Sequence, residues 1–562
     1  MMKNLSSLKG NSSVVNSQLG NSNWGILMQM LALAVAIVTL YGSFLFSPLV
    51  FDDRTFFENF SEFQQRPLNL DLRRLSYKTF EWTQALSGDP ILGWRLGNLA
   101  LHIANSFLLL LLLRQLFAST ISQETALTGD KSSPVTKILP LSWLAFFGAL
   151  LFSLHPIAVY GVAYLVQRTT LMATLFSLLT WWLFCYGLQR QKQGWLLASV
   201  VTYLLAVLSK EHAIMVPAVC AALALLFHGK PDKQLFKALW LTFLLYVIVA
   251  IFILYQIKHA NILGQPYEPG GIALLVARGI DPTLAYPLSI LTQSFLYFKY
   301  LWLWLVPSPT WMSVNMLENF SPRLWVWPET VALIAFVAYP IITTRLLLQR
   351  GKTGLLGFAL LSPWLLFATE LSTIRIQEVF VLYRSYLWMP CLFAALPFVF
   401  QKIPAKYAAA ILASVTLALI PATWNRLVVF SDPVLLWSDA LRLAPANNAG
   451  GRGKMHLNRG IAYAEQKHFP EAIQDLSEAI RLIPRNPALY NNRAMAYREN
   501  RQFALALDDS NIAIRLNPNV PHSYLGRAKA HEELGNTLAA LKDYVQGCQM
   551  GLAEACQKTV WE

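Results

Sequence analysis

The stretch GWRLGNLALHIANSFLLLLLL (93–113) decides the class of fold, because its apolar run is long enough to cross a bilayer. Asn98, His102 and Asn105 recur in it at helical spacing, which is equally consistent with polar packing inside a helical bundle and with a role in a site. The whole chain shares this apolar character, since 55% of its 562 residues are hydrophobic and only 14% are charged. The composition predicts a polytopic membrane protein rather than a soluble enzyme.

Eleven candidate spans can be placed from the apolar runs. They cover residues 25–47, 95–117, 139–155, 168–187, 194–209, 213–228, 236–257, 328–346, 354–370, 386–400 and 405–423. Several are shorter than the roughly 20 residues that a span needs, which indicates tilted or partly protein-buried helices. Lys and Arg cluster in alternate loops, and the positive-inside rule assigns those loops to the cytoplasm. An odd number of spans then leaves the C-terminal tail on the outer side.

The run near residues 286–306 interrupts this alternation, because the loops on both sides of it need to face outward. We predict an interfacial or re-entrant helix here, with Lys299 among aromatic residues as expected of a segment at headgroup level. If this run spans instead, the count becomes twelve and the tail lies in the cytoplasm.

The C-terminal tail repeats itself every 34 residues. The residues in step are Gly460, Ala494 and Ala528; Tyr463, Tyr497 and His531; Ala472, Ala506 and Ala540; and Ala479, Ala513 and Gly547. This pattern resembles the tetratricopeptide repeat, in which paired helices cross at small residues. The stretch WSDALRLAP (437–445) resembles the second helix of a preceding half repeat. The tail is therefore predicted to form an α-solenoid.

The concave face of such a solenoid commonly holds a peptide or a protein. The candidate residues for binding an acceptor there are Asn458, Asn492, Tyr463 and Tyr497. Two cysteines, Cys548 and Cys556, lie close together near the end of the array. Their spacing leaves a disulfide bond and two buried thiols equally open.

The stretch FDDRTFFENF (51–60) directly follows the first candidate span. Asp52 and Asp53 are costly to place near lipid unless they face water, a cation or a reacting group. One interpretation is a solvated loop in which an aspartate caps a helix. The other is a general base at the membrane surface, where one carboxylate takes a proton from an acceptor hydroxyl and the other orients it or helps to bind a cation.

Cations and hydroxyl groups in the other outward loops favour the functional interpretation. The charged and histidine residues concerned are His155, Arg168, Lys210, Glu211 and Arg384. A lipid-linked phosphate at the membrane boundary needs such groups, because Arg can grip it with two hydrogen bonds and Lys supplies a point charge. Each residue also has a structural explanation, as a membrane anchor, a helix-end histidine or an ion-pair partner.

These motifs occur in an order that resembles one known family. The order is FDDRTFFEN, RPLNL (66–70), GWRLGNLALHIANSFLLLLLL, HPIAVYGVAYLVQRTTLMATLF (155–176), LSKEHAIMVP (208–217), ILTQSFLYFKYLWLWLVP, ATELSTIRIQEVFVLYRSYLWMP and the repeats. It resembles that of the TMTC-like proteins, the transmembrane, tetratricopeptide-containing protein O-mannosyltransferases of animals and their bacterial relatives. The resemblance covers nearly the whole chain after residue 45.

The resemblance implies an inverting GT-C glycosyltransferase that uses a polyprenyl-phosphate sugar. Asp52, or else Asp53, would be the base that activates a Ser or Thr hydroxyl. The residues implied near the donor phosphate are Arg168, Lys210 and Arg384, with His155, Glu211 and Arg66 as second choices. The chain departs from the family at Tyr383, where an acidic residue or histidine is common, and at Lys299, where arginine is more frequent. These departures leave the sugar and the details of donor binding open.

The predicted fold is all-α, with a membrane helical bundle followed by a tetratricopeptide solenoid. Its predicted parts are a cytoplasmic tail (1–24), a catalytic membrane domain (25–424) with an outward loop (48–92), and an outward repeat domain (432–562). The predicted partners are the lipid bilayer, a polyprenyl-phosphate-linked sugar and an acceptor protein. The short loops favour a bacterial inner membrane, with the site and repeats in the periplasm. The net charge of +14 is explained by the basic loops, so nucleic-acid binding is not expected.

Two other functions stay open at the level of sequence. One is transfer of a preassembled oligosaccharide from a polyprenyl-diphosphate carrier, for example onto pilin, and the other is a non-catalytic scaffold that recruits partners through its repeats. Asp52 and Asp53 offer ligands for a divalent cation such as Mg²⁺ or Mn²⁺, although the family resemblance implies metal independence at least as readily. A common site for Asp52, Arg168, Lys210 and Arg384 would favour an enzyme, and their dispersal would weaken that hypothesis.

Overall fold

The computed structural model describes residues 23–58, 60, 70–128, 138–230, 232–259, 271–376, 378–446 and 448–559. Arg66 and most of the predicted N-terminal tail lie outside the described residues. Every regular element in the described part of the chain is a helix, apart from an isolated bridge between Ile138 and Pro404, so the predicted all-α class is confirmed. The chain forms two compact units, Met1–Val314 with Glu318–Phe430 and Asn315–Leu317 with Ser431–Glu562.

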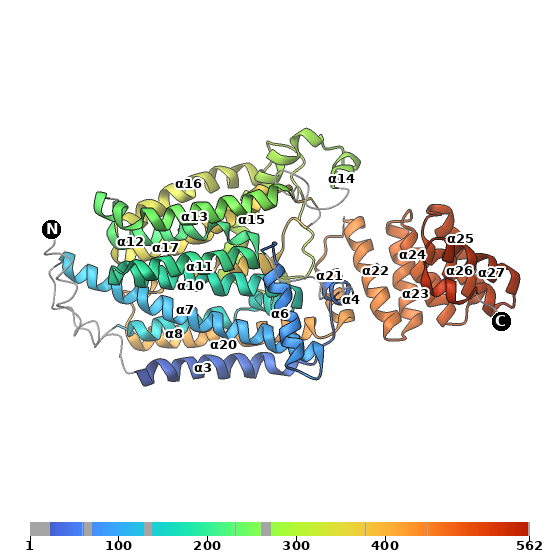
Figure 1. The fold of residues 1–562 in the computed structure, drawn as a ribbon, viewed down its shortest axis with the longest axis horizontal. Coiled ribbons are helices and arrows are strands. Elements are labelled where there is room, and N and C mark those ends of the chain that lie inside the picture. The colour runs from blue at the N-terminus through green and yellow to red at the C-terminus, as the bar shows by residue number, and fades with distance from the viewer. Residues whose placement is uncertain are drawn as a thin grey trace. The chain divides into compact units, whose positions relative to one another are not determined.

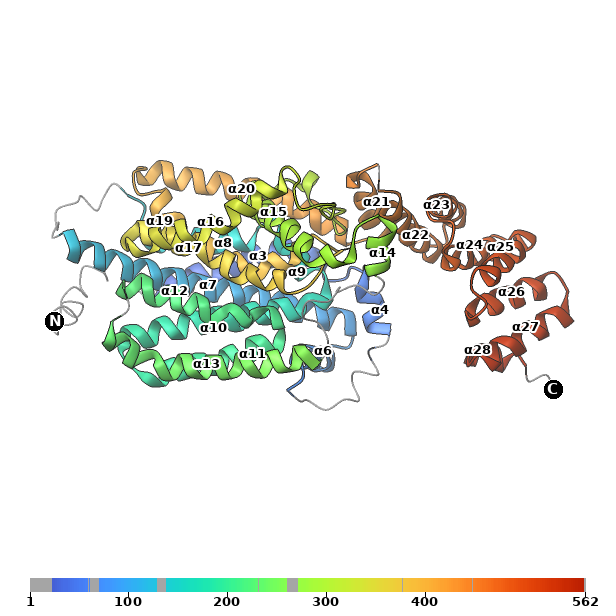
Figure 2. The ribbon, with the colours of Figure 1, turned by 90° about the horizontal axis from the view of Figure 1, so that it is seen from above.

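The first unit is a bundle of apolar helices that run side by side (Figure 1, Figure 2). Its long helices are α3 (Asn23–Tyr41), α7 (Pro90–Thr128), α8 (Leu141–Ser153), α10 (Arg168–Arg190), α11 (Gln193–Ser209), α12 (Val216–His228), α13 (Lys233–His259), α15 (Ala285–Leu305), α16 (Glu329–Leu348), α17 (Gly351–Phe367) and α20 (Ala405–Phe430). Shorter elements lie between them, namely α4 (Asp52–Glu58), α6 (Arg74–Ala85), α9 (Pro156–Val162), η3 (Leu165–Gln167), η4 (Glu211–Met215), α14 (Gly271–Ala277), η7 (Ala368–Ser372) and η8 (Leu382–Arg384).

Eight helical stretches in the described residues are long and apolar enough to cross a membrane. They contain α3, α7, α10, α12, α13, α16, α17 and α20. The pair α8 and α9 is a further candidate, bent by 61°, and the shorter apolar helices Gln193–Ser209 and Pro390–Val399 match the two remaining predicted spans. The chain is therefore a multi-pass membrane protein by composition and helix length, while eleven as the number of crossings stays a prediction.

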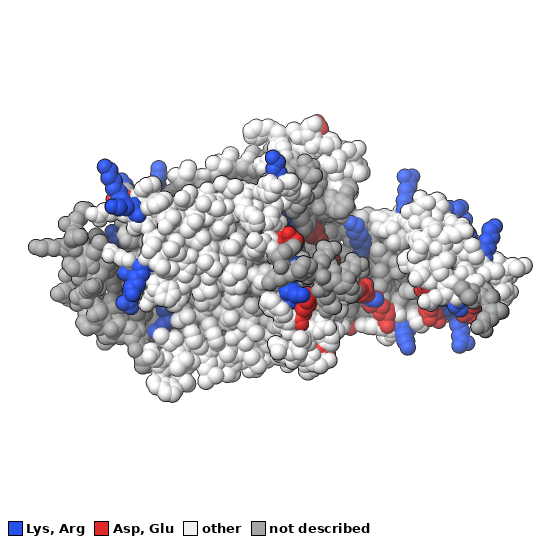
Figure 3. All heavy atoms as spheres, viewed as in Figure 1, with Lys and Arg blue, Asp and Glu red and all other residues white. Residues whose placement is uncertain are grey.

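Positive charge gathers at one end of the bundle, which we call the basic end (Figure 3). The turns that join α10 to α11, α12 to α13 and α16 to α17 contribute Arg190, Lys192, Lys230, Lys233, Arg345 and Arg350. Helices α4, α6 and α14 lie at the opposite end, which we call the α4 end (Figure 1). The short 3-10 helices η3, η4, η7 and η8 also belong to the α4 end, since they follow helices that run from the basic end or precede helices that return to it.

Helix α15 covers the run that interrupts the alternation of predicted spans. It is a single unbroken helix, and its interfacial or re-entrant placement stays a prediction. Its contacts stay at the α4 end, because Ser289 near its start donates to the carbonyl of Thr373 (3.4 Å) and Trp304 near its finish donates to Ser385 (3.0 Å). Both partners belong to the segment around η7 and η8. Both ends of α15 therefore contact the same segment of the chain, and the side of the membrane on which its flanking loops lie stays a prediction.

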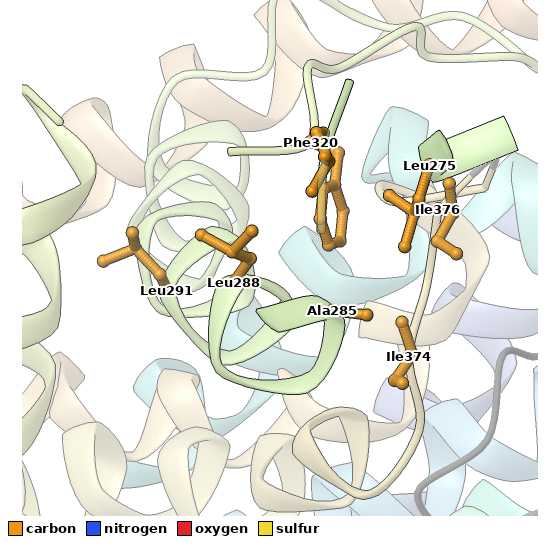
Figure 4. Close-up of a cluster of buried hydrophobic side chains, with 8 residues drawn as sticks. Leu275, Ala285, Leu288, Leu291, Phe320, Ile374 and Ile376 are labelled. Atoms are coloured by element: carbon orange, nitrogen blue, oxygen red, sulfur yellow. The ribbon is translucent and has the colours of Figure 1, made fainter. Parts of the chain in front are cut away.

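An apolar cluster joins the start of α15 to the loops beside it (Figure 4). Leu288 of α15 packs in this cluster with Phe320 and Ile374, which come from the loops that follow α15 and η7. Leu275 of α14 is buried in the same cluster. Loops at the α4 end thus have an apolar core of their own, which restricts their motion.

The second unit consists of antiparallel helix pairs. Its helices are α21 (Pro433–Leu443), α22 (Ala449–Glu465), α23 (Phe469–Leu482), α24 (Pro487–Glu499), α25 (Phe503–Leu516), α26 (Pro521–Glu533), α27 (Thr537–Gln549) and α28 (Ala553–Gln557). The repeated small residues Ala472, Ala506 and Ala540 are buried where the helices cross, as predicted. A Cβ added to Gly460 would lie only 2.8 Å from Cγ of Leu476, so this crossing requires glycine or a displaced neighbour. The predicted tetratricopeptide solenoid is confirmed.

A repeated ion pair fastens the two helices of each repeat, and the sequence analysis missed it. Arg459 donates from Nε and Nη2 to both oxygens of Asp475, at 2.6 and 2.8 Å. The same two-pronged contact recurs 34 and 68 residues later, in the pairs Arg493–Asp509 and Arg527–Asp543. Both members of each pair follow the 34-residue period, so the repeat alignment already contained the signal.

The structure pairs Cys548 of α27 with Cys556 of α28 in a disulfide bond, which decides between the two alternatives for these cysteines. The bond holds the short helix α28 against the last repeat, where Ala555 packs in a cluster with Tyr544 and Leu525. Disulfide bonds persist in oxidising compartments and are rare in the reducing cytosol.

We predict that Ala513→Leu destabilises the repeat array by about 1–3 kcal/mol, because Ala513 is fully buried and a larger side chain would overpack the crossing. Ala504→Leu is the matched control, since Ala504 is exposed on the same helix. Thermal unfolding of the detergent-solubilised chain checks both variants. Equal unfolding midpoints for the two would contradict the helix packing described above.

Candidate functional site

Polar side chains along α7 bind backbone carbonyls near the bend between α8 and α9. The side-chain amide of Asn98 donates to the carbonyls of Val162 (3.2 Å) and Leu165 (3.3 Å). His102 donates to the carbonyl of Ser153 (3.0 Å), and Asn105 donates to that of Leu171 (3.1 Å). These carbonyls belong to the bent α8–α9 segment and to the start of α10. Backbone groups released at such a bend must find partners inside the protein, because lipid offers none. The geometry therefore favours polar packing over a direct role of these three residues in a site.

Arg95 of α7 continues this support toward α4. Its Nε and Nη2 donate to the carbonyls of Ser47 (3.0 Å) and Pro48 (2.6 Å), which lie just before α4, and its Nη1 donates to Ala163 (3.3 Å). Arg95 is 5% exposed. One buried guanidinium thus ties the approach to Asp52 to the loop that follows α9.

Asp53 is the buried member of the aspartate pair, and both of its oxygens are occupied. They accept the amide N–H groups of Leu165 (3.0 Å) and Val166 (2.8 Å). Burial raises the pKa of Asp53 to about 7, although the two amide hydrogen bonds and the positive charge of Arg95 oppose this shift. Asp53 therefore anchors α4 to η3.

Asp52 is the exposed member of the pair. Its Oδ2 accepts a hydrogen bond from the hydroxyl of Tyr164 at 2.6 Å. Partial desolvation by the surrounding protein raises the pKa of Asp52, and the Tyr164 hydrogen bond opposes this shift. Asp52 can therefore be reached from solvent while one of its oxygens is held in place, as a general base requires.

Two tyrosines connect Asp52 to the predicted phosphate-binding cations. The ring of Tyr164 packs against that of Tyr383, with 5.8 Å between ring centres. On the Tyr383 ring lie Nζ of Lys210 at 5.2 Å and the guanidinium carbon of Arg384 at 6.0 Å. Asp52, Lys210 and Arg384 therefore belong to one continuous set of contacts at the α4 end.

Lys210 is a buried cation without a carboxylate at ion-pairing distance among the described residues. Its Nζ donates to Oγ1 of Thr170 (2.7 Å) and to the side-chain carbonyl of Gln167 (3.2 Å). Burial, together with the positive charges of Arg73 and Arg384, lowers the pKa of Lys210 to about 7, although the carboxylates of Glu211 and Glu370 oppose this shift. A bound anion would add a direct ionic partner for the ammonium group.

Glu370 organises the charges behind Lys210. Its carboxylate lies 3.1 Å from Nη1 of Arg384, 3.3 Å from Nε of Arg375 and 3.2 Å from Nε2 of His212. Within the described part of the chain, the side-chain hydrogen bond of Arg384 runs from Nη1 to Glu370, so its Nε and Nη2 keep donors for a further partner. The cluster ties η4, η7 and η8 together.

Glu211 lies beside this cluster and is already paired. Arg73 donates to it through Nε (2.9 Å) and through Nη2, and Nδ1 of His212 is 3.3 Å from it. Its carboxylate therefore holds the segment before α6 against η4. Direct contact of Glu211 with a phosphate is not supported by this arrangement.

Arg168 directs its hydrogen bonds to residues other than those around Tyr383. Its Nε donates to Asn98 (2.8 Å), its Nη1 to Thr83 (2.9 Å) and its Nη2 to the carbonyl of Trp94 (2.6 Å). The side chain is fully buried, with the guanidinium over the ring of Phe80. Phosphate binding by Arg168 stays a prediction that these contacts disfavour.

His155 serves as the N-cap of α9. Its Nδ1 accepts the amide N–H of Ile157 at 3.2 Å, which fixes the start of the helix after the bend. Its ring stacks on Trp304 of α15, with 4.2 Å between ring centres. His155 therefore joins the bent segment to α15, and its predicted role near the donor is untested.

The predicted acceptor-binding residues lie on the first helices of successive repeats. Asn458 and Tyr463 are on α22, and Asn492 and Tyr497 are on α24. Arg459 lies over the ring of Tyr463 at 5.9 Å, and Arg493 lies over that of Tyr497 at 5.5 Å. All four predicted residues are half-buried, so part of each side chain is accessible to a partner.

The described residues do not fit a divalent cation site. They contain no group of three His, Cys, Asp or Glu side chains that could hold a metal ion. Both oxygens of Asp53 already accept amide hydrogen bonds, which leaves Asp52 as the accessible carboxylate of the pair. Mg²⁺ and Mn²⁺ favour six ligands that are mostly oxygen.

Sequence reasoning missed Tyr164, Arg95 and Glu370, although each lies inside a quoted motif. Tyr164 is part of HPIAVYGVAYLVQR, Arg95 of GWRLGN and Glu370 of ATELSTIR. A charged residue within an apolar run, such as Arg95, is a signal by itself because it needs an internal partner. Nothing in the local sequence distinguishes Tyr164 from the other tyrosines of the bundle.

Comparison with known proteins gives one curated relative. No family model matches the chain. The chain is similar to Protein O-mannosyl-transferase Tmtc3 of Drosophila melanogaster, with 24% identity over 536 residues that cover 82% of this chain and 56% of that protein. The chain thus spans about half the length of this relative.

Two solved structures that resemble parts of the chain have low TM-scores. The first TPR domain of human RPAP3 is 30% identical over 19% of this chain and 87% of that domain, with a TM-score of 0.19. Yeast Tom70 is 10% identical over 74% of this chain and 85% of that structure, with a TM-score of 0.16.

We predict that Glu370→Gln destabilises the membrane unit by about 3–5 kcal/mol, because it leaves buried guanidinium groups without their shared carboxylate. Glu58→Gln is the control, since Glu58 and Arg54 form an exposed pair that is worth at most about 1 kcal/mol. The unfolding midpoint in detergent checks both variants. A midpoint for Glu370→Gln within error of that for Glu58→Gln would show that the cluster does not hold this end of the bundle.

Proposed function

We propose that the chain is an integral-membrane protein O-glycosyltransferase. It moves a sugar from a polyprenyl-phosphate donor to Ser or Thr hydroxyls of an exported protein. The observation that carries the proposal is the exposed carboxylate of Asp52, held by Tyr164 and linked through Tyr383 to a buried lysine that has no carboxylate at ion-pairing distance among the described residues. The similarity to a protein named as an O-mannosyl-transferase agrees with this chemistry and suggests mannose as the first sugar to test.

The proposed reaction uses Asp52 at one end of this set of contacts and Lys210 with Arg384 at the other. Asp52 takes the proton from the acceptor hydroxyl while the oxygen of that hydroxyl attacks the anomeric carbon of the sugar. The new bond forms on the face opposite the bond between the anomeric carbon and the phosphate oxygen, which breaks, so the configuration inverts. The polyprenyl phosphate leaves with the bonding electron pair. Lys210 and the open donors of Arg384 stabilise the growing charge on this phosphate.

The remaining predicted residues take supporting roles in this proposal. Asp53 and Arg168 hold the backbone around the site, and Glu211 pairs with Arg73. His155 caps α9 and packs on α15. Arg66 stays a prediction, because it lies outside the described residues. No step uses a metal ion, since the side chains that the structure describes near Asp52 do not provide a coordination site.

The α4 end and the repeats are proposed to face outward, toward the periplasm of a bacterial cell. The positive-inside rule supports this orientation because the basic end carries the clustered Lys and Arg. The disulfide between Cys548 and Cys556 supports an oxidising compartment for the repeats. The repeats are then proposed to bind the acceptor through Asn458, Asn492, Tyr463 and Tyr497.

We predict that Asp52→Asn abolishes transfer, because an amide cannot accept the proton of the acceptor hydroxyl. The measurement is mass spectrometry of envelope proteins from cells that carry the native chain, no chain, or the variant at equal levels. A hexose on Ser or Thr should disappear with the deletion and with Asp52→Asn. Asp53→Asn should instead reduce the amount of folded chain, since it weakens the two amide contacts of α4.

Two results of this measurement would count against the proposal. A glycoproteome unchanged by deletion, in a strain without a redundant enzyme, would exclude the transferase. A folded Asp52→Asn variant with native activity would exclude Asp52 as the base.

A second prediction concerns pH. The pKa of Lys210, lowered to about 7, means that Lys210 is charged below this pH and neutral above it. The kcat/KM for donor should therefore fall as pH rises through about 7. Lys210→Arg should remove this decline, because a guanidinium stays charged throughout the range. The same decline in Lys210→Arg as in the native chain would show that another group binds the phosphate.

A further inference from the structure

We propose that Tyr164 is a positioning residue for Asp52. Its hydroxyl holds Oδ2 of Asp52, so that Oδ1 is the oxygen presented to the acceptor hydroxyl. This inference rests on the proposed function and names a residue that neither the motifs nor the family resemblance had assigned. Tyr164 keeps its own proton, and the proton from the acceptor ends on Asp52.

The position of Tyr164 is fixed by contacts on both sides of it along the chain. Arg95 donates to the carbonyl of Ala163, and Asp53 accepts the amide of Leu165. Tyr164 itself is 3% exposed. The backbone on both sides of Tyr164, at Ala163 and Leu165, is therefore fixed, and this fixes the position of the Tyr164 hydroxyl beside Asp52.

The aromatic ring is also confined. Phe51 packs edge-on against it, with 5.5 Å between ring centres, and Tyr383 packs on it at 5.8 Å. Phe51 adopts a left-handed φ of 56°, which is unfavourable for a residue with a side chain and persists only where surrounding contacts maintain it. This turn places the Phe51 ring on Tyr164 directly before the reacting carboxylate.

The hydrogen bond has a chemical consequence for Asp52. A hydroxyl that donates to a carboxylate stabilises its charged form, so Tyr164 holds the pKa of Asp52 down against the effect of desolvation. Among the described residues, the other charged or titratable groups that face this pair are Asp53, Tyr383 and Arg95, the last acting through Asp53. Lys210 and Arg384 lie beyond Tyr383. Loss of the Tyr164 hydroxyl should therefore make Asp52 harder to ionise.

The test is the pH profile of transfer by purified full-length chain in detergent. The probes are mannose on a polyprenyl phosphate and a synthetic peptide rich in Ser and Thr. Tyr164→Phe keeps the ring and removes the hydroxyl. Because a base must be ionised to act, the acidic limb of kcat should move upward by about one pH unit, and the rate on that limb should fall roughly tenfold.

Tyr160→Phe is the matched control. Tyr160 lies four residues earlier, on α9, and is equally buried. Its ring packs against Phe430, away from the contact between Tyr164 and Asp52. It should leave the acidic limb where the native chain has it. A shift that is the same in both variants would reflect general loosening of the loop and would overturn the proposal.

Native transfer with an unshifted limb in a folded Tyr164→Phe variant would overturn the role of Tyr164 and leave the proposed function standing. No transfer by the native chain to any Ser or Thr acceptor would remove the proposed function and this inference together.

Discussion

The contact between Asp53 and the amides of Leu165 and Val166 is the constraint on which the α4 end depends. It joins residues more than 100 positions apart and occupies donors that the backbone exposes where α9 ends. Arg95 complements it by satisfying carbonyls on the same two segments. Buried backbone groups need hydrogen-bond partners, and these side chains supply them where the chain bends. The same bend brings Tyr164 to Asp52.

Much of the polarity in the bundle follows from this need. Asn98 bonds to Arg168 and to released carbonyls, and His102 bonds to Ser153. Such residues look functional in sequence, because polar groups in apolar helices are costly. Their hydrogen-bonding capacity is, however, used within the protein. Asp52 is accessible, and Lys210 has no carboxylate at ion-pairing distance among the described residues, so these two residues are the stronger candidates for contact with substrates.

The parts of the structure that follow from local pattern were predictable. Apolar runs gave the helices of the bundle, and the 34-residue period gave the solenoid. Spacing alone left the bond between Cys548 and Cys556 open. The partner of Asp52 could not be predicted, because it depends on how α9 and α4 pack after the chain has passed through other helices. Arg168 and Lys210 also looked alike in sequence, as basic residues beside spans, and differ only in their three-dimensional partners.

The most direct test of the central claim is a cryo-electron microscopy structure of the full chain with a non-hydrolysable phosphonate analogue of a polyprenyl-phosphate sugar. The phosphonate should contact Lys210 and Arg384, and the anomeric carbon should lie on the side of Asp52 while Asp53 keeps its two amide contacts. A phosphonate bound at the basic end, or bound at the α4 end with Asp53 released to face the sugar, would contradict the account.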